Sequence, residues 1–287
     1  MEINKVLRLY CAQINPTVGD FEGNFKIISS HIKRAIENSS DIIVFPELSI
    51  TGYPPEDLLL RPAFIEQNLA YIEAVRELCS NITAVIGFVY RENDIFNSAA
   101  IINNKKLVSV YNKQYLPNYS VFDEERYFRK GSAGYLYRLK NTLFAVNICE
   151  DIYYSSGPLR YQAISGGAAL VINISASPYH YGKIDERQKM LYTRAVDNRV
   201  NILYVNLAGG QDELVFDGSS MLVNEKGKIL IQAQSFKEDF FIYDLDTDDL
   251  DSTRLQDAKY KNQRDSMRLE SGAVPVIDLK AAGKKNN

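Results

Sequence analysis

Three side chains with reactive groups stand at the ends of apolar runs in this sequence. Glu47, Lys113 and Cys149 each follow a stretch rich in Val, Ile, Leu or Phe. Such stretches predict buried strands. Strand ends on one rim of an α/β core are where catalytic groups collect. A carboxylate, an amine and a thiol at three such ends therefore predict a nucleophilic hydrolase site.

Each of the three groups has a distinct part in such chemistry. A free thiol with a pKa of about 8.5 is mostly un-ionised at neutral pH, so Cys149 needs a base. The neighbouring Glu150 and Asp151 are expected to raise its pKa further. Glu47 can take the proton, a role worth roughly 10²- to 10⁴-fold in rate, and Lys113 can stabilise the oxyanion by about 2.7–4 kcal/mol. Each residue taken singly also has a purely structural interpretation: Cys149 as a buried core cysteine, and Glu47 and Lys113 as solvated charges at strand edges.

The sequence around these residues resembles the nitrilase, or carbon–nitrogen hydrolase, superfamily. Within that superfamily it is similar to the glutaminase domain of glutamine-dependent NAD synthetases. The similar segments are residues 45–62, 113–128, 148–153, 173–180 and 209–218. The similarity extends from about Leu7 to about Asp244, and so covers most of the chain.

The resemblance implies a fold and a domain organisation. It implies a four-layer α-β-β-α sandwich of the nitrilase type, which agrees with the predicted runs of β-β and β-α units. We expect a carbon–nitrogen hydrolase domain over residues 1–250 and a C-terminal extension or linker over residues 251–287. The family usually continues into a synthetase domain, which is not expected here because the last segment is short and polar.

The resemblance also implies the substrate contacts, which are Tyr53, Tyr119, Glu124, Tyr153, Ser177 and Lys183. Glu124 is expected to accept a hydrogen bond from the substrate's α-ammonium group. Ser177 and Lys183 are expected to face the amino-acid end of the substrate. Lys183 stands where some family members have Arg, and a lysine lacks the bidentate grip on a carboxylate. Tyr153 is expected to pack on the substrate side chain, with a plain core aromatic as the alternative.

The function implied is a cysteine-dependent glutaminase that supplies ammonia for NAD synthesis from nicotinic acid adenine dinucleotide. The hydrolytic step needs no cofactor, and ATP and Mg²⁺ act only at a synthetase domain that this chain lacks. The expected partners are L-glutamine, an ammonia-dependent NAD synthetase domain or subunit, and further copies of the chain in a homo-oligomer. The alternatives are another carbon–nitrogen hydrolase, such as an ω-amidase or carbamoylase, and a catalytically silent assembly or regulatory module.

Composition argues against several other classes. The 287 residues carry a net charge of −3 and a pI near 5.6, so nucleic acid and anionic membranes are not expected partners. No apolar run approaches the roughly 18 residues of a membrane helix. Three cysteines and an N-terminus without a secretory signal predict a cytoplasmic location. Two histidines without metal-ligand spacing predict no metal site, and a Cys149–His180 dyad remains an alternative to the Glu47 base.

The elements expected to position these residues alternate along the chain. Apolar spacing and a cap at Asp20 predict a helix to about Asn38, and further helices over residues 62–79, 159–165 and 183–198. Strands are expected over 7–14, 82–90, 99–111, 169–175 and 202–207, and a hairpin over 219–232. The Pro-, Asn- and Tyr-rich segment after Lys113 is typical of a mobile functional loop.

Overall fold

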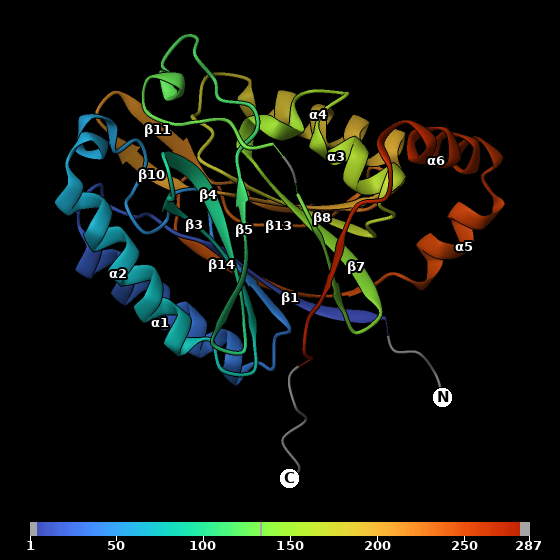
Figure 1. The fold of residues 1–287 in the computed structure, drawn as a ribbon, viewed down its shortest axis with the longest axis horizontal. Coiled ribbons are helices and arrows are strands. Elements are labelled where there is room, and N and C mark those ends of the chain that lie inside the picture. Colours follow the sequence, from blue (N-terminus) through green and yellow to red (C-terminus); the bar gives the residue numbers. More distant parts are fainter. Residues whose placement is uncertain (1–4, 133, 282–287) are drawn as a thin grey trace.

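Two large β-sheets stacked face to face form the centre of the molecule (Figure 1). The computed structural model describes residues 5–132 and 134–281. The six-stranded sheet has the order β14 (Asp239–Asp246), β1 (Val6–Gln13), β2 (Ile42–Val44), β3 (Thr83–Arg91), β4 (Ile95–Asn103) and β5 (Lys106–Asn112). The seven-stranded sheet has the order β13 (Ile229–Gln232), β12 (Met221–Val223), β9 (Asn201–Asn206), β8 (Leu170–Ser175), β7 (Thr142–Ile148), β6 (Leu136–Leu139) and β15 (Val276–Asp278).

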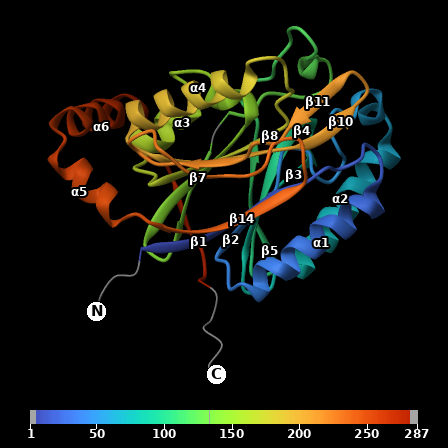
Figure 2. The same ribbon diagram turned by 180° about the vertical axis from the view of Figure 1, so that it is seen from behind.

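Helices cover the outer face of each sheet (Figure 2). The six-stranded sheet is covered by α1 (Phe21–Glu37) and α2 (Pro62–Leu78), and the seven-stranded sheet by α3 (Pro158–Arg160) and α4 (Lys183–Asn198). A separate hairpin consists of β10 (Ala208–Gln211) and β11 (Leu214–Asp217). The chain is therefore a four-layer α-β-β-α sandwich, and this prediction from the sequence is confirmed.

The alternation of side chains along the strands explains how the layers pack together. Successive side chains of a strand point to opposite faces of its sheet. Leu7 and Leu9 of β1 thus face the other sheet, whereas Tyr10 and Ala12 pack beneath the helices. On β8 the side chains alternate between the two sides in the same way. Apolar side chains consequently fill the space between the sheets and the space under each helix layer, and the rims of the sheets are left for polar groups.

Most elements predicted from local pattern are confirmed. The helix α4 has the predicted bounds, and α1 begins after Asp20, whose Oδ1 accepts from the Gly23 N–H at 2.9 Å. The predicted strand pair is present, with the second strand turning into a third at Asn104 and Lys105, which both have positive φ. The short strand β6, the hairpin β10–β11 and the acid-rich edge strand β14 were missed. Their short or polar sequences become strands only because neighbouring strands supply the hydrogen bonds.

The described part of the C-terminal segment is folded onto the domain. After α5 (Asp248–Gln256) and α6 (Ala258–Ser271), β15 pairs in parallel with β6. Buried Arg254 donates hydrogen bonds to the backbone carbonyls of Arg199 and Ala168. The expected boundary at residue 250 thus falls inside α5, and the described residues 251–281 make contacts with the rest of the domain. The polar sequence concealed this, since an arginine can dock through backbone carbonyls. Residues 282–287 lie outside the described part.

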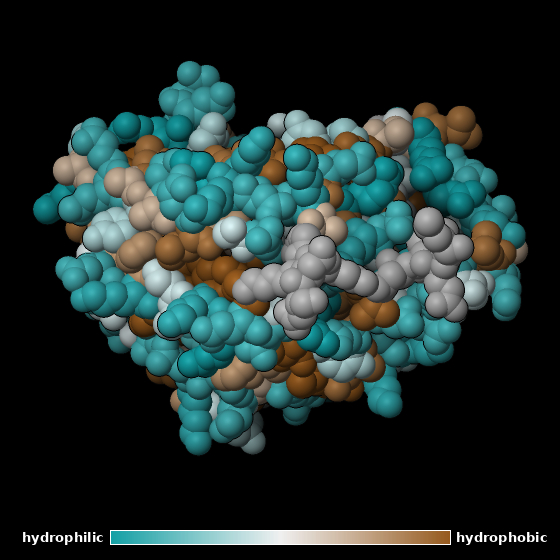
Figure 3. All heavy atoms as spheres, turned by 90° about the horizontal axis from the view of Figure 1, so that it is seen from below, coloured by the Kyte–Doolittle hydropathy of each residue, from teal (hydrophilic) through white to brown (hydrophobic). Residues whose placement is uncertain are grey.

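The face of the sandwich that Figure 3 draws is mainly polar. Hydrophilic residues cover most of the face that is drawn as spheres in Figure 3, and apolar residues are visible between them. Among the described residues, no helix combines the length and apolar character needed to cross a membrane.

Candidate active site

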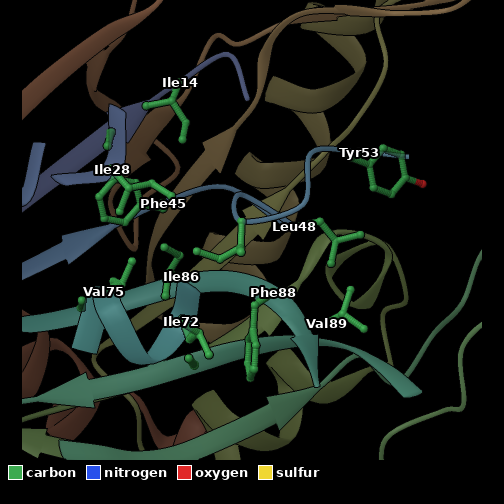
Figure 4. Packing of buried hydrophobic residues seen from close by; sticks show 14 of the residues in the cluster. Ile14, Ile28, Phe45, Leu48, Tyr53, Ile72, Val75, Ile86, Phe88 and Val89 are labelled. Carbon is green, nitrogen blue, oxygen red and sulfur yellow. The ribbon is translucent and has the colours of Figure 1, made fainter. Parts of the chain in front are cut away.

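Glu47 lies in a tight loop that follows β2. The loop passes over β3 at Gly87, where a Cβ atom would come within 2.2 Å of the Leu48 nitrogen, so the approach requires glycine. The Gly87 N–H donates to the Pro46 carbonyl at 3.2 Å. Phe45 and Leu48 point into the apolar cluster beneath α1 and α2 (Figure 4). Anchored on both sides, Glu47 is held at the rim of the sheet with 0% of its surface exposed.

Lys113 follows β5 and lies between two carboxylates. Its Nζ is 2.7 Å from Glu47 Oε1 and 2.8 Å from Glu124 Oε1, and 0% of its surface is exposed. The Tyr53 hydroxyl donates to the same Glu124 oxygen at 2.9 Å. Burial acts to lower the pKa of Lys113, but the carboxylates of Glu124 and Glu47 hold that pKa well above its ordinary value. The amine is therefore a buried cation. Burial raises the pKa of Glu124, and Lys113 opposes that rise.

Cys149 comes directly after β7 and has a left-handed backbone conformation. Its φ is +43°, a region that residues other than glycine rarely occupy. A 3₁₀ turn, Cys149–Ile152, follows directly. The side-chain amide of Asn173 donates to the Cys149 carbonyl at 3.4 Å and helps to hold the turn. A sharp strand-to-helix turn of this kind presents its side chain at the end of the sheet. Cys149 is 4% exposed.

Asp151 connects the Cys149 turn to the strand end that carries Lys113. Its Oδ2 accepts from the backbone N–H of Ile148 at 3.0 Å, immediately before Cys149. Its Oδ1 accepts from the backbone N–H of Gln114 at 3.0 Å, immediately after Lys113. The two backbone segments are thus bonded to one buried carboxylate, and this fixes the thiol relative to the amine.

The surroundings keep the Cys149 thiol un-ionised. Burial raises its pKa well above the ordinary value, the Glu47 carboxylate raises it further, and Lys113 opposes the rise. Glu150 also raises the pKa, in the direction expected from the sequence. A neutral thiol is a poor nucleophile, so the site can react only if a neighbouring base removes the proton.

Glu47 and Lys113 each retain one hydrogen-bonding position for that chemistry. A carboxylate has about four acceptor positions. Glu47 Oε1 accepts from Lys113 and Asn97, and Oε2 accepts from the Ala176 N–H at 2.7 Å. Within the described chain, this leaves one position on Oε2 for a thiol proton. Lys113 has three N–H donors, of which two serve the carboxylates, so the third can stabilise an oxyanion.

Cys149 lines a cavity of about 300 Å³. Four of the substrate contacts implied by the sequence line the same cavity: Tyr119, Tyr153, Ser177 and Lys183. The Lys183 Nζ lies 5.3 Å from the centre of the Tyr153 ring, a cation–π distance. The structure therefore brings these side chains together with the thiol, although the segments that carry them lie far apart in the sequence.

Tyr53 and Glu124 lie in a different place from the other expected contacts. They line a neighbouring cavity of about 200 Å³, which shares Val121 and Phe122 with the first. The Glu124 carboxylate is occupied by Lys113 and Tyr53. It therefore lies in the ion cluster and not among the residues that line the Cys149 cavity, and the contact of Glu124 with a substrate ammonium stays a prediction. A buried lysine attracts any carboxylate within reach, because an unpaired buried charge is costly.

Three side chains in or beside the site were not singled out as site residues from the sequence. Asn97 donates to Glu47 Oε1 at 2.7 Å. Glu150 and Glu213 line the Cys149 cavity, and Glu150 accepts from the Tyr119 hydroxyl at 2.9 Å. The available signal for Asn97 was its place in β4, where an amide interrupts an apolar run. Glu213 has no local signal, since it lies in the turn of the β10–β11 hairpin.

The other candidate groups have ordinary surroundings. Cys11 and Cys79 are free and buried, and burial raises the pKa of Cys79 to about 12. His180 lines the Cys149 cavity, but its Nδ1 lies 3.0 Å from the carbonyl of Tyr181 in its own loop. In the part of the chain that the structure describes, no cluster of three or more His, Cys, Asp or Glu side chains could hold a metal ion.

Comparison with known protein families and sequences gives consistent matches. A family model described as carbon-nitrogen hydrolase matches residues 8–255. The glutamine-dependent NAD(+) synthetase of Thermotoga maritima is 42% identical over 276 residues, which cover 96% of this chain and 47% of that protein. The protein of the same name from Aquifex aeolicus is 43% identical over 258 residues, covering 89% of this chain and 45% of that protein. The chain spans about half the length of the curated relatives it matches.

Two solved structures also match this chain over most of its length. The glutamine-dependent NAD+ synthetase of Acinetobacter baumannii, solved in complex with ADP, matches with a TM-score of 0.81 at 38% identity. The match covers 86% of this chain and 47% of that one. A C145A mutant of a Nesterenkonia amidase from the nitrilase superfamily matches with a TM-score of 0.77 at 22% identity, over 90% of this chain and 98% of that one. The amidase likeness is one of fold.

Proposed function

This chain belongs to the carbon–nitrogen hydrolase family, and from that premise we propose that it hydrolyses the side-chain amide of L-glutamine at Cys149. The observation that carries the proposal is the composition of one site. A thiol lines a cavity of about 300 Å³, and the pKa of that thiol is influenced by the buried Glu47 and Lys113. These are the nucleophile, base and cation that acyl transfer from an amide needs.

The proposed reaction runs in two steps. Glu47 takes the thiol proton while the sulfur of Cys149 attacks the amide carbonyl, and the third N–H of Lys113 stabilises the oxyanion. The C–N bond then breaks, Glu47 returns the proton to the leaving nitrogen, and ammonia departs from a thioester. In the second step Glu47 takes a proton from water, which attacks the thioester and releases glutamate and the free thiol. No redox group or metal takes part in these steps.

The cavity wall carries both signs of charge, as a zwitterionic amino acid requires. Glu150 and Glu213 supply carboxylates, and Lys183 supplies an amine. We assign the carboxylates to the substrate's α-ammonium group and Lys183, with Ser177, to its α-carboxylate. Tyr119 and Tyr153 then pack on the aliphatic part of the substrate. Neither Tyr53 nor Glu124 is needed as a contact, since both belong to the ion cluster around Lys113.

Removing the charged groups of the cavity wall should lower kcat/KM for glutamine much more than kcat/KM for a simple amide. We expect Glu150→Gln and Lys183→Met to lower kcat/KM for glutamine by roughly 10- to 100-fold, because each removes a hydrogen bond to a charged group. Hydrolysis of propionamide, which has neither charged group, should change much less. Ammonia release on both substrates measures this, with the exposed Glu125→Gln as the control. Equal losses on both amides, or wild-type preference for propionamide, would favour an ω-amidase or carbamoylase.

We propose further that the ammonia serves ATP-dependent NAD synthesis from nicotinic acid adenine dinucleotide. The support is the name shared by the relatives and the chain's coverage of about half their length. A synthetase domain or subunit distinct from this hydrolase domain carries out that step, and ATP and Mg²⁺ act there. The hydrolytic site needs no cofactor. The proposal includes a homo-oligomer and a cytoplasmic location, since free thiols such as Cys149 persist in a reducing compartment.

Coupling to a synthetase should be visible in the rate of hydrolysis. The loop after Lys113 contributes Tyr119 to Phe122 to the wall of the Cys149 cavity, so a protein pressing on this loop can change the site. A coupling of about 1–3 kcal/mol would raise turnover by roughly 5- to 150-fold if it is expressed in the rate. Ammonia release is measured with an ammonia-dependent NAD synthetase, loaded with ATP and its dinucleotide substrate or left unloaded as the control. Unchanged turnover would contradict the coupling.

A further inference from the structure

Asn97 joins the two buried carboxylates of the ion cluster. It lies in β4, between β3 and β5, and 0% of its surface is exposed. Its Nδ2 lies 2.7 Å from Glu47 Oε1 and 3.4 Å from Glu124 Oε2. The acids themselves come from the loop after β2 and from the 3₁₀ turn Glu124–Arg126. The amide is therefore the one described group, besides the Lys113 amine, that donates to both of them.

The two carboxylates determine which way the amide faces. The oxygen and nitrogen of an amide are nearly alike in shape, but an ionised carboxylate only accepts hydrogen bonds. Both contacts of Asn97 thus require its NH₂ group. Its Oδ1 then points away, and no partner for that oxygen exists among the described residues. An unpaired buried acceptor destabilises a fold. A residue kept at such a cost is more consistent with function than with stability.

The same residue also contacts the backbone of the cation. The Asn97 carbonyl accepts from the Lys113 N–H at 2.9 Å. One residue of β4 thus touches Glu47, Glu124 and Lys113, which arrive from three other segments. A change at Asn97 would therefore alter the arrangement of all three.

The charges that surround Asn97 explain why a neutral donor is needed. The groups that face the cluster are the carboxylates of Glu47 and Glu124, the Lys113 amine, the Tyr53 hydroxyl and the Cys149 thiol. Two carboxylates share a single cation, and like charges at close range oppose their joint ionisation. A donor with two N–H groups can bond to both carboxylates without adding a charge.

We propose that Asn97 is a positioning residue that holds the carboxylates of Glu47 and Glu124 side by side around Lys113 by donating one amide N–H to each. The inference rests on the proposed function, in which Glu47 is the base. It adds that the base works only while the bridge holds its carboxylate in place beside Lys113. Asn97 itself makes no contact with the reacting atoms.

The test compares Asn97→Leu and Asn97→Asp with the wild type. Leucine has no donor, and an aspartic acid has at most one donor hydrogen, so neither can bridge two carboxylates. Both variants should lower kcat/KM for glutamine by roughly 10- to 100-fold at neutral pH. The acid limb of the pH profile should move up by about one pH unit, because Glu124, whose pKa burial already raises, loses one of its hydrogen-bond donors. The rate of Cys149 alkylation by iodoacetamide, followed by intact mass against pH, should show the same shift.

Asn103→Leu is the matched control. Asn103 is a buried amide on the same strand, and its Nδ2 donates to Thr83 Oγ1 at 3.0 Å, away from the acids. This variant should keep the wild-type profiles. Asn97 variants that fold, by circular dichroism and Tm, but titrate like the wild type would overturn the inference. If the wild type fails to hydrolyse glutamine yet the alkylation shift appears, the proposed substrate is wrong and the inference stands. The near-isosteric Asn97→Asp keeps the test open if leucine prevents folding.

Discussion

Replacing Cys149 by alanine should lower ammonia release from glutamine by roughly 10⁴- to 10⁶-fold, the loss typical of removing a catalytic nucleophile. The Cys149 thiol lines the 300 Å³ cavity, and no other described cysteine lines it. A chloroketone analogue of glutamine should add once to the wild type and not to Cys149→Ala. Intact-mass measurement after incubation with the analogue checks both statements.

Cys79→Ala is the matched control for this experiment. Cys79 is a free buried thiol at the end of α2, and its Sγ contacts the Val75 carbonyl at 3.3 Å. Its removal should leave both hydrolysis and the adduct unchanged. An adduct that persists in Cys149→Ala, or full hydrolysis by that variant, would contradict the thioester mechanism. Loss of activity with a normal adduct in Cys79→Ala would indicate that the second thiol matters.

Replacing Lys113 by methionine should slow the reaction and destabilise the fold. The reaction loses the oxyanion donor, which is worth about 2.7–4 kcal/mol. The fold loses the cation between Glu47 and Glu124, and breaking a buried ion pair costs about 3–5 kcal/mol because the partner charges stay buried. We expect ammonia release to fall by at least about 10²-fold and the Tm to fall by on the order of 10 °C. Enzyme assays and calorimetry measure the two losses separately.

The stability loss of Lys113→Met should depend on pH with a defined sign. The pKa of Glu124 is raised in the folded state, chiefly by burial, and Lys113 restrains that rise. A group with a raised folded pKa favours folding at low pH, and this contribution is lost as the pH rises through that pKa. Removing Lys113 raises the pKa of Glu124 further and so enlarges the loss. The Tm difference between variant and wild type should therefore be largest at neutral pH and shrink as the pH falls toward 5.

Lys140→Met is the control for the loss of an ordinary ion pair. Lys140 lies 2.6 Å from Asp41, but it is partly exposed and remote from the cavity residues. It should keep full activity and lose less stability than Lys113→Met, because it pairs with the single buried carboxylate of Asp41 and its own amine is partly exposed. A Tm difference for Lys113→Met that is constant from pH 5 to pH 8, or no larger than that of Lys140→Met, would contradict the charge-burial explanation.

Much of the fold followed from local pattern. The helix over residues 183–198, the strand over 170–175 and the strand that ends before Cys149 all stand where apolar spacing and its interruptions predicted them. Such patterns are set by neighbours a few residues apart, since a strand alternates with a period of two and a helix with a period of 3.6. The acid-rich edge strand β14 and the C-terminal strand β15 did not follow, because their partners β1 and β6 lie far away in the sequence.

The sequence by itself determined the chemical inventory of the site, namely a thiol, an acid and an amine, each at the end of an apolar run. Only the tertiary structure decided how these groups are paired. Lys113 bonds to Glu47 across a separation of 66 residues, and Asn97 bonds to Glu47 across 50. It also placed Glu124 beside Lys113 in the ion cluster, a pairing that no local pattern predicted. The physical reason is that a buried charge takes whichever partner the fold brings within about 3 Å, and that choice depends on how two sheets pack and not on any local pattern.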